Sequence, residues 1–322
     1  MNKASYIRSL LSEEAKKLFD DIAYSIVLGA NAQISLIITM IKDVLLNNSS
    51  ASVEDLKTSI KNIIDYYQAT RGQNSRAIFN ALSIIGSSAL SYNYKTNRDF
   101  KNALLDSIEH FEKISKQNVD TAVKYAVNVT LGQSRIMCFD YSSTVEKFIS
   151  ALPPGVEIVI PESRALNGGR PYLNSLVKME RKVHYIPDTC MMQVLPSCDS
   201  VFIGAETIYV DGTAFNTVGS DILSVLAGYY KTPYYVLSPL IKLDLRSIYG
   251  EHRLDSMEYD YANRFTDTIS QNLLSKLNCN SVKLISVPGS LITAFICEKG
   301  VLSPQSMFPI ALDYAKEIGV SS

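Results

Sequence analysis

The sequence lacks the short motifs that would assign it at once to a common functional class. No C-x-x-C pair, H-x-x-x-H spacing, G-x-G-x-x-G run or Walker phosphate loop occurs in its 322 residues. These absences argue against a zinc site, a dinucleotide-binding enzyme and a P-loop enzyme. We therefore expect no metal and no cofactor.

The chain also has almost no net charge and no long apolar run. Its 31 basic and 32 acidic side chains leave a net charge of −1, which disfavours direct binding to nucleic acid. The most apolar stretch, residues 34–41, is far shorter than the ~20 residues of a membrane span, and we find no signal peptide. Five cysteines, an odd number, fit reduced thiols. Together these features predict a cytoplasmic protein without membrane contact.

Proline is absent before Pro153, which favours long uninterrupted helices in the first part of the chain. Apolar residues recur at three- and four-residue spacing from Leu10 to Ile26, and this pattern predicts one helix there. Ser52 and Asp55 have the spacing of a capping box that opens another helix. Further helices are predicted near residues 36–44, 75–90 and 98–128. Residues 1–127 are thus predicted to form an all-helical domain.

After residue 130 the pattern changes to short apolar runs with room for a helix between most of them. Such runs are typical of strands buried on both faces of a parallel sheet. Asp211 and Gly212 form a two-residue hairpin signal within this region. Residues 128–322 are predicted to form a doubly wound α/β domain. The runs lie at residues 135–139, 156–160, 183–186, 200–203, 234–237 and 291–296.

Ligands of open parallel sheets bind beyond the carboxyl ends of the strands, so the polar residues that follow each run are candidate ligand contacts. Ser220 is a candidate N-cap whose helix would present free N–H groups to an anion. Carboxylates, cations and hydroxyls at one sheet edge would suit a small phosphorylated polyol. The candidates are Asp140, Ser142, Ser143, Glu162, Arg164, Asp188, Glu206, Asn216, Ser238 and Lys242.

Simpler explanations exist for several of these residues. Arg164 could pair with Glu162 or Asp188, and Lys242 could be a solvated loop lysine. Cys138 lies inside an apolar run, where a small core residue is a better interpretation than a nucleophile. Since Cys138 lies two residues before Asp140, both would point to the same face of an extended strand.

An ordered series of motifs resembles one protein family over most of the chain from about residue 130. The family contains the alpha, beta and delta regulatory subunits of eukaryotic translation initiation factor 2B. It also contains methylthioribose-1-phosphate isomerase and ribose-1,5-bisphosphate isomerase. Its architecture, a helical domain followed by a Rossmann-like domain, agrees with the pattern above. The matching segments are residues 162–170, 201–206, 211–219 and 233–236, Lys242, and residues 291–304.

The resemblance implies that the enzymes' catalytic groups are replaced in this chain. Those enzymes use a cysteine after the first strand and an aspartate in a glycine-alanine-aspartate motif, and Asp140 and Glu206 stand at these places. Their asparagine-lysine pair becomes Asn216-Thr217. A longer carboxylate displaces its oxygens, and catalytic geometry tolerates little displacement.

The glycine-alanine-glutamate form and the Tyr141-Ser142 pair are most similar to the alpha subunits. The resemblance therefore implies a non-catalytic regulatory subunit that retains a pocket for a sugar phosphate or nucleotide. It implies a homodimer through the Rossmann-like domain, with initiation factor 2B-type subunits and initiation factor 2 as further partners. The alternative is a divergent sugar-phosphate aldose–ketose isomerase that uses Asp140 or Cys138 with Glu206. The implied pocket residues are Arg71, Ser142, Ser143, Arg164, Glu206, Asn216 and Lys242.

Overall fold

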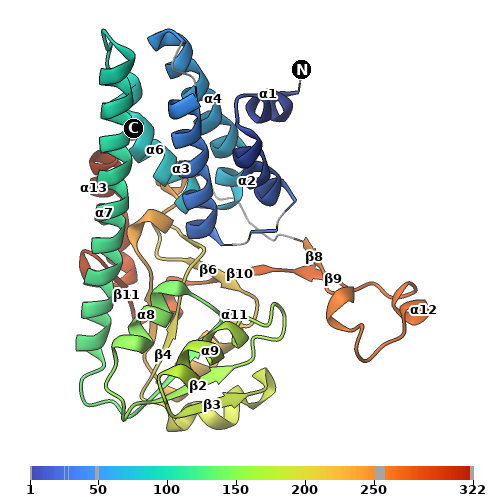
Figure 1. The fold of residues 1–322 in the computed structure, drawn as a ribbon. Coiled ribbons are helices and arrows are strands. Elements are labelled where there is room, and N and C mark those ends of the chain that lie inside the picture. The colour runs from blue at the N-terminus through green and yellow to red at the C-terminus, as the bar shows by residue number, and fades with distance from the viewer. Residues whose placement is uncertain (1, 25, 28, 48–50, 251–257, 320–322) are drawn as a thin grey trace. The chain divides into compact units, whose positions relative to one another are not determined.

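The computed structural model describes residues 2–24, 26, 27, 29–47, 51–250 and 258–319 (Figure 1). Its contacts group into two compact units. Unit 1 comprises residues 1–117, 241–243 and 312–322, and unit 2 comprises residues 118–240 and 244–311. The division into domains at 1–127 and 128–322 stays a prediction, because a grouping of contacts does not show which segment folds by itself.

Unit 1 is helical, as the apolar spacing predicts. Its core consists of aliphatic and aromatic side chains with almost no exposed surface, among them Ile37, Ile60, Ile63 and Phe100. None of the helices in the described ranges has the length and hydropathy that a bilayer span requires. The helices are α1 (Lys3–Ser9), α2 (Glu13–Ala23), α3 (Ala30–Asn47), α4 (Val53–Ala69), α5 (Arg71–Asn74), α6 (Arg76–Ser91) and the first part of α7 (Asn97–Val129).

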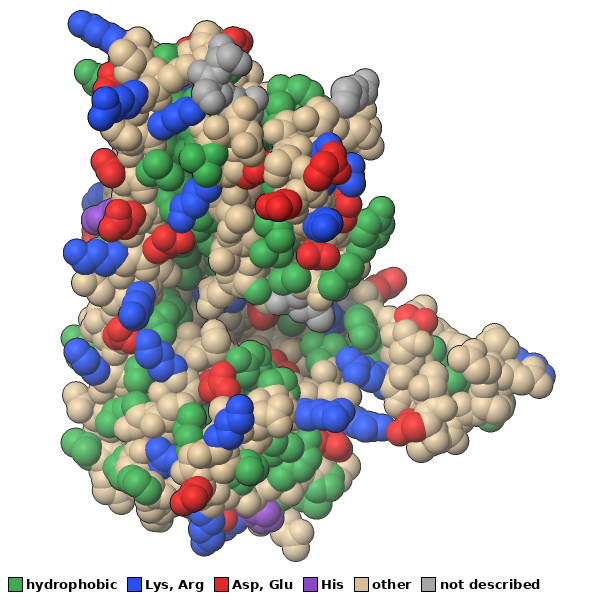
Figure 2. Space-filling model, in the orientation of Figure 1, with side chains coloured by type: hydrophobic (Ala, Val, Ile, Leu, Met, Phe, Trp, Pro, Cys, Tyr) green, Lys and Arg blue, Asp and Glu red, His purple; other side chains and the backbone are tan. Residues whose placement is uncertain are grey.

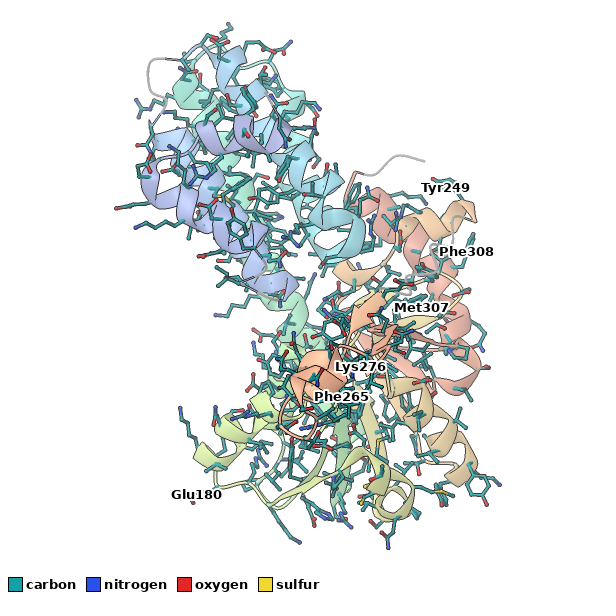
Figure 3. The ribbon with its side chains drawn as sticks, turned by 90° about the vertical axis from the view of Figure 1, so that its right-hand side faces the viewer. Glu180, Tyr249, Phe265, Lys276, Met307 and Phe308 are labelled. Atoms are coloured by element: carbon teal, nitrogen blue, oxygen red, sulfur yellow. The ribbon has the colours of Figure 1, made fainter. Side chains whose placement is uncertain are left out.

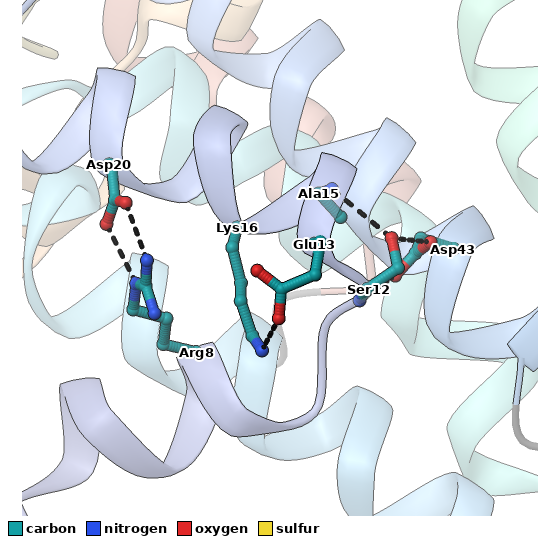
Figure 4. Close-up of polar contacts among 7 residues, drawn as sticks. All are labelled: Arg8, Ser12, Glu13, Ala15, Lys16, Asp20 and Asp43. Atoms are coloured by element: carbon teal, nitrogen blue, oxygen red, sulfur yellow. Dashed lines mark hydrogen bonds and ion pairs between the residues drawn. The ribbon is translucent and has the colours of Figure 1, made fainter.

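The capping box at the start of α4 is confirmed, but the single helix predicted from Leu10 to Ile26 is wrong. A new helix begins at Glu13 because the hydroxyl of Ser12 accepts a hydrogen bond from the backbone N–H of Ala15 at 3.3 Å (Figure 4). The same hydroxyl donates to Asp43 Oδ1 at 2.7 Å. The carboxylate of Asp43, on α3, thus fixes the N-cap that interrupts the apolar pattern.

Unit 2 contains the predicted doubly wound sheet. Its seven strands lie in the order β12-β11-β7-β4-β1-β2-β3, and all neighbours are parallel except β11 and β12. The chain order reverses between β1 and β4, which is the switch point where such sheets bind ligands. The strands are β1 (Arg135–Phe139), β2 (Glu157–Pro161), β3 (Val183–Ile186), β4 (Ser200–Ile203), β7 (Tyr234–Leu237), β11 (Ala294–Cys297) and β12 (Gly300–Leu302).

One face of this sheet packs against helices through a single apolar cluster. The second part of α7 contributes Ala122 and Ala126, α8 contributes Phe148, and α9 contributes Leu176. Strand residues that alternate along β1 complete the cluster, and Cys138 is one of them. The remaining helices of the unit are α8 (Ser143–Ala151), α9 (Arg170–Lys178), α10 (Met191–Val194), α11 (Ser220–Tyr230), α12 (Gln271–Leu274) and the start of α13 (Met307–Glu317).

Two smaller antiparallel sheets complete unit 2. Strands β5 (Thr207–Ile208), β6 (Ala214–Thr217) and β10 (Leu284–Val287) form one, and β8 (Glu258–Asp260) pairs with β9 (Asn280–Val282) in the other. The predicted hairpin exists between β5 and β6, but its turn is longer than the two residues predicted. The N–H of Gly212 donates to the carbonyl of Tyr209, and Gly212 then takes the left-handed conformation at φ +83°.

Candidate functional site

Four chain segments meet at the switch point of the sheet in unit 2, namely those that follow β1, β2 and β4, and strand β6. Asp140 directly follows β1 and has a φ of +58°, a left-handed conformation that aspartate tolerates better than most residues. Gly204 to Glu206 follow β4, the neighbour of β1. An added Cβ at Gly204 would lie 2.6 Å from the Cβ of Ser142, so these two segments are in close contact. We call Asp140, Ser142, Ser163, Glu206 and Thr217 the switch-point cluster.

The carboxyl group of Asp140 is the centre of this cluster. The hydroxyl of Ser163 donates to its Oδ1 at 2.9 Å, and the hydroxyl of Thr217 donates to its Oδ2 at 2.7 Å. The phenol of Tyr172 donates to the Asp140 carbonyl at 2.8 Å and accepts the N–H of Ser142 at 2.9 Å. Asp140 is only 8% exposed. A single buried side chain therefore joins the segments after β1 and β2 to strand β6.

The surroundings of Asp140 favour its protonated form. Burial raises its pKa, the hydroxyls of Thr217 and Ser163 act in the opposite direction, and the nearby charge of Glu206 raises it further. The net result is a raised pKa. A carboxyl group that holds its proton more firmly than usual, next to a second carboxyl group, has the chemical make-up of an acid/base pair.

The loop after β2 is shaped around Asp140. Asp188 accepts hydrogen bonds from the backbone N–H groups of Ser163 at 2.8 Å and of Arg164 at 2.7 Å. The carboxylate of Asp188 therefore stabilises the backbone of this loop. An added Cβ at Gly168 would lie 1.8 Å from Asp140 Oδ1. Only glycine therefore fits at residue 168 while Asp140 keeps its hydrogen bonds.

The helix that follows β6 starts one residue earlier than the predicted N-cap implies. Gly219, with φ +104°, is the N-cap, and Ser220 is the first residue of α11. The hydroxyl of Ser220 accepts Asn216 Nδ2 at 3.1 Å instead of capping the helix. Ser142 does cap α8, accepting the N–H of Val145 at 3.4 Å, and Ser143 opens that helix as an exposed residue.

The side chain of Arg164 pairs with neither Glu162 nor Asp188, the two carboxylates that the sequence suggested. Its guanidinium lies 3.5 Å from Asp267 Oδ2 and donates to the carbonyl of Arg264 at the same distance, while only its backbone N–H reaches Asp188. Both members of the Arg164–Asp267 pair are more than half exposed, so the pair contributes little to stability.

Cys138 belongs to the core. Its side chain has no exposed surface, and burial raises the pKa of its thiol. Because Asp140 leaves the extended conformation, Cys138 and Asp140 do not share a face as the strand pattern predicted. The thiol lies in the cluster beneath α7, α8 and α9, and the carboxyl group lies against the loop after β2.

Arg71 belongs to unit 1, where it lies beside a cavity of about 210 Å³. Its guanidinium donates to the carbonyls of Ile22 and Ala23 at the end of α2. The rings of Phe19, Tyr66 and Tyr67 form the cavity wall, and Phe19 and Tyr66 stack with centroids 5.8 Å apart. Arg71 therefore caps a helix and borders an aromatic cavity within one unit.

Lys242 also belongs to unit 1, in the short segment that α6 holds in place. Asn80, which is 2% exposed, donates through its amide nitrogen to the carbonyls of Ile241 and Leu243, both at 2.9 Å. These carbonyls flank Lys242 on either side in the chain. Asn80 thus sets the backbone from which Lys242 extends, a role that no short-range sequence signal indicates.

Replacing Asn80 by leucine is expected to lower the unfolding free energy by about 2 kcal/mol, because the buried carbonyl of Leu243 and the partly buried carbonyl of Ile241 lose their partner. Chemical denaturation measures the change. Ser87→Ala on the same helix is the matched control, since it removes one exposed hydrogen bond only. Equal effects of the two substitutions would contradict the role given to Asn80.

Comparison with known proteins identifies the family. A sequence model described as the initiation factor 2 subunit family matches residues 27–304, which is most of the chain. The chain belongs to this family. The resemblance seen in the motifs is thereby confirmed, and so is the expected α/β fold with a helical N-terminal region.

Relatives within the initiation factor 2 subunit family include both enzymes and initiation factors. The chain is 36% identical to a putative methylthioribose-1-phosphate isomerase of Methanocaldococcus jannaschii over 110 residues, 33% of this chain and 32% of that protein. It is 22% identical to the delta subunit of translation initiation factor 2B of Dictyostelium discoideum over 90% of this chain and 48% of that one. The chain thus spans about a third to a half of these relatives' lengths.

A solved structure of 5-methylthioribose 1-phosphate isomerase from Pyrococcus horikoshii OT3 has the same fold. The TM-score is 0.72 at 17% identity, over 94% of this chain and 88% of that one. An identity this low shows the fold alone. Family membership therefore allows both a regulatory and an enzymatic role, and the chemistry of the switch-point cluster has to distinguish them.

Proposed function

We propose that this family member is a non-catalytic regulatory subunit, similar to the alpha subunit of translation initiation factor 2B. One observation carries the proposal. The two residues that stand where the related isomerases have cysteine and lysine, Asp140 and Thr217, are hydrogen-bonded to each other at 2.7 Å. Two departures from the enzyme pattern thus form one structural contact.

The hydrogen bond between Thr217 and Asp140 occupies the carboxyl group that catalysis would need. Both carboxyl oxygens of Asp140 accept hydroxyl hydrogen bonds, from Ser163 and Thr217, and Thr217 is 3% exposed. A general acid or base has to reach the proton of its substrate within hydrogen-bond distance. A side chain this buried, with both oxygens engaged, is better suited to hold three segments together.

The cluster is compatible with a bound phosphorylated sugar or nucleotide. The start of α8 presents backbone N–H groups beside Ser142 and Ser143, and helix N-termini favour anions. We assign Glu206 and Asn216 to the polyol part of such a ligand. Within unit 2, Arg164 is the proposed cationic contact. Lys242 and Arg71, which belong to unit 1, stay predictions from the family pattern.

The proposed setting is the cytoplasm, with the chain acting inside an assembly. Partners of the proposed subunit are a second copy, joined through the Rossmann-like domain, and other subunits of the initiation factor 2B type. Initiation factor 2 is the proposed target. The similarity to a delta subunit over most of this chain supports this assignment.

The alternative function is a divergent aldose–ketose isomerase of the methylthioribose-1-phosphate or ribose-1,5-bisphosphate type. It is favoured by the raised pKa of Asp140 close to the Glu206 carboxylate. Such a pair would move a proton between neighbouring carbons of a ring-opened sugar, with Asp140 as the acid and Glu206 as the base.

One preparation tests both functions. We expect no turnover of methylthioribose 1-phosphate, ribose 1,5-bisphosphate or ribose 5-phosphate, but a rise in melting temperature with at least one of them. Purification from the native organism should recover other initiation factor 2B-type subunits. Turnover that Glu206→Gln abolishes would establish the isomerase instead. The absence of turnover, stabilisation and partners would refute both functions.

A further inference from the structure

Residues 258–283 form an arm that projects from the rest of unit 2 (Figure 1). Strands β8 and β9 form its base, and the short helix α12 lies near its tip. Figure 3 views the molecule from the side toward which the arm points. Residues of the arm line a cavity of about 310 Å³, and none of them belongs to the switch-point cluster. The arm thus has a cavity that the proposed function does not use.

The lining of this arm cavity is polar and nearly uncharged. Asp260 carries the only charge among the described residues that line it. Lys276, labelled in Figure 3, is next in the chain to two lining residues but is not itself one of them. Figure 2 shows the arm mostly in tan, the colour of the backbone and of uncharged polar side chains. The lining includes four carboxamides, those of Asn263, Gln271, Asn278 and Asn280.

Hydrogen bonds within the arm hold part of this lining in place. Asp260 Oδ1 accepts the backbone N–H of Ala262 at 2.9 Å. Asn278 Oδ1 accepts the backbone N–H of Asn280 at 3.0 Å. Because these two side chains are already oriented by the backbone, less rotational freedom is lost when a ligand binds to them.

Other carboxamides of the lining have unused hydrogen-bonding groups. The side chains of Asn263, Gln271 and Asn280 make no hydrogen bond to any described residue. Each of these carboxamides offers two N–H donors and one acceptor oxygen in a single plane. The cavity therefore gathers donors and acceptors in similar numbers, without a strong charge.

This composition disfavours two common classes of ligand. An anion would meet the carboxylate of Asp260 and no cation among the described lining residues. A divalent cation prefers several carboxylate oxygens, and the described part of the chain has no group of three or more metal-ligating side chains. A neutral ligand rich in hydrogen-bonding groups remains.

We propose that the arm cavity binds a neutral polyol of about the size of a monosaccharide. Every hydroxyl group of a polyol both donates and accepts, so it pairs with either end of a carboxamide. Leu274 and Leu277, which also line the cavity, offer an apolar contact to the C–H groups of such a ligand. Small-molecule sites have volumes of about 300–1,000 Å³, and 310 Å³ lies at the small end of that range.

The arm cavity differs in chemistry from the pocket of the proposed function. That pocket is proposed to take a phosphorylated ligand, with the start of α8 and Arg164 at its anionic group. The arm cavity has a carboxylate where a phosphate would need a cation. The two sites are therefore independent, and neither proposal depends on the other.

Isothermal titration calorimetry of the full chain with D-glucose, D-ribose and myo-inositol tests the arm cavity. At least one of these three polyols should bind, with one molecule per chain. Asn263→Ala and Gln271→Ala should each raise its dissociation constant at least about threefold, because each removes a carboxamide that hydrogen-bonds the ligand. Inorganic phosphate should leave the affinity for the polyol unchanged. Competition by phosphate would place the polyol at an anion site and overturn the proposal.

Asn272→Ala is the matched control, because Asn272 is an exposed carboxamide beside Gln271 on α12 and does not line the cavity. It should keep the wild-type affinity. All three variants should keep the wild-type melting temperature, since each replaces an exposed side chain. Failure of all three polyols to bind would overturn the proposal. So would binding that Asn263→Ala and Gln271→Ala leave unchanged, or that Asn272→Ala weakens equally.

Discussion

Replacing Gly168 by alanine is expected to destabilise the protein by about 2–4 kcal/mol. The new Cβ would lie 1.8 Å from Asp140 Oδ1, 2.8 Å from its Cγ and 3.2 Å from Ser163 Oγ. The carboxyl group cannot move aside at low cost, because the hydroxyls of Ser163 and Thr217 hold both of its oxygens. Either these hydrogen bonds break or the loop after β2 shifts.

Chemical denaturation measures this effect against a matched glycine. Gly155→Ala should change stability by less than about 0.5 kcal/mol, because an added Cβ at that position meets no heavy atom within 4 Å. The double variant Gly168→Ala with Asp140→Ala removes the obstructing carboxyl group. It should be markedly less destabilised than the sum of the single variants. Strict additivity would show that the strain at residue 168 does not act through Asp140.

The second large effect is expected in the pH dependence of stability. In the folded protein burial raises the pKa of Asp140. As the pH rises above the unfolded value of about 3.9, the unfolded chain loses this proton while the folded chain keeps it. The stability contributed by Asp140 is therefore fully present below the unfolded pKa and is lost as the pH rises through the folded pKa. Asp140→Asn removes this dependence, so the variant should gain stability relative to wild type as the pH rises from about 4 through the folded pKa of Asp140.

Asp199 provides a control of opposite sign. Burial alone would raise its pKa, but hydrogen bonds from the backbone N–H groups of Ser134 and Arg135 produce a lowered pKa. Its stabilising effect is present above the unfolded pKa and is lost as the pH falls, so Asp199→Asn should lose stability most at neutral pH. Denaturation curves across this pH range measure both slopes. Parallel curves for Asp140→Asn and wild type would contradict a raised pKa.

The two experiments on Asp140 also bear on the proposed function. If Asp140 is a structural centre, its variants change stability and pH dependence while any ligand-induced stabilisation persists. If Asp140 is an acid of an isomerase, Asp140→Asn abolishes turnover in a protein that remains folded. The same variant therefore separates a scaffold role from a catalytic one.

Much of the fold follows from local properties of the sequence. The capping box of α4, the apolar runs that became β1, β3, β4 and β7, and the helical spacing before Pro153 all depend on residues close together in the chain. Local patterns of this kind act through backbone propensity and burial of one face, so they can be interpreted without contacts at long range. The family resemblance rests on the same local motifs.

Where local patterns failed, a residue distant in the chain or an unusual backbone conformation decided the outcome. Asp43 accepts a hydrogen bond from Ser12, and the N-cap at Ser12 interrupts the helix predicted over residues 10–26. Asp140 has a left-handed backbone, so its side chain does not follow the strand pattern that Cys138 obeys. The sequence indicated Asp140 and Glu206 as candidates at the sheet edge, and their role in one site stays a prediction. It did not indicate that Asp140 would be buried.

The composition class, the helical and doubly wound parts, and three residues of the switch-point cluster, Asp140, Ser142 and Glu206, could be derived from the order of amino acids along the chain. How those residues affect each other required the folded arrangement. Thr217 lies 77 residues from Asp140 in the chain, and no pattern along the sequence pairs a threonine with a carboxylate at that separation. Folding brings strand β6 against the end of β1, and the resulting burial changes the chemistry of a carboxyl group that is otherwise ordinary.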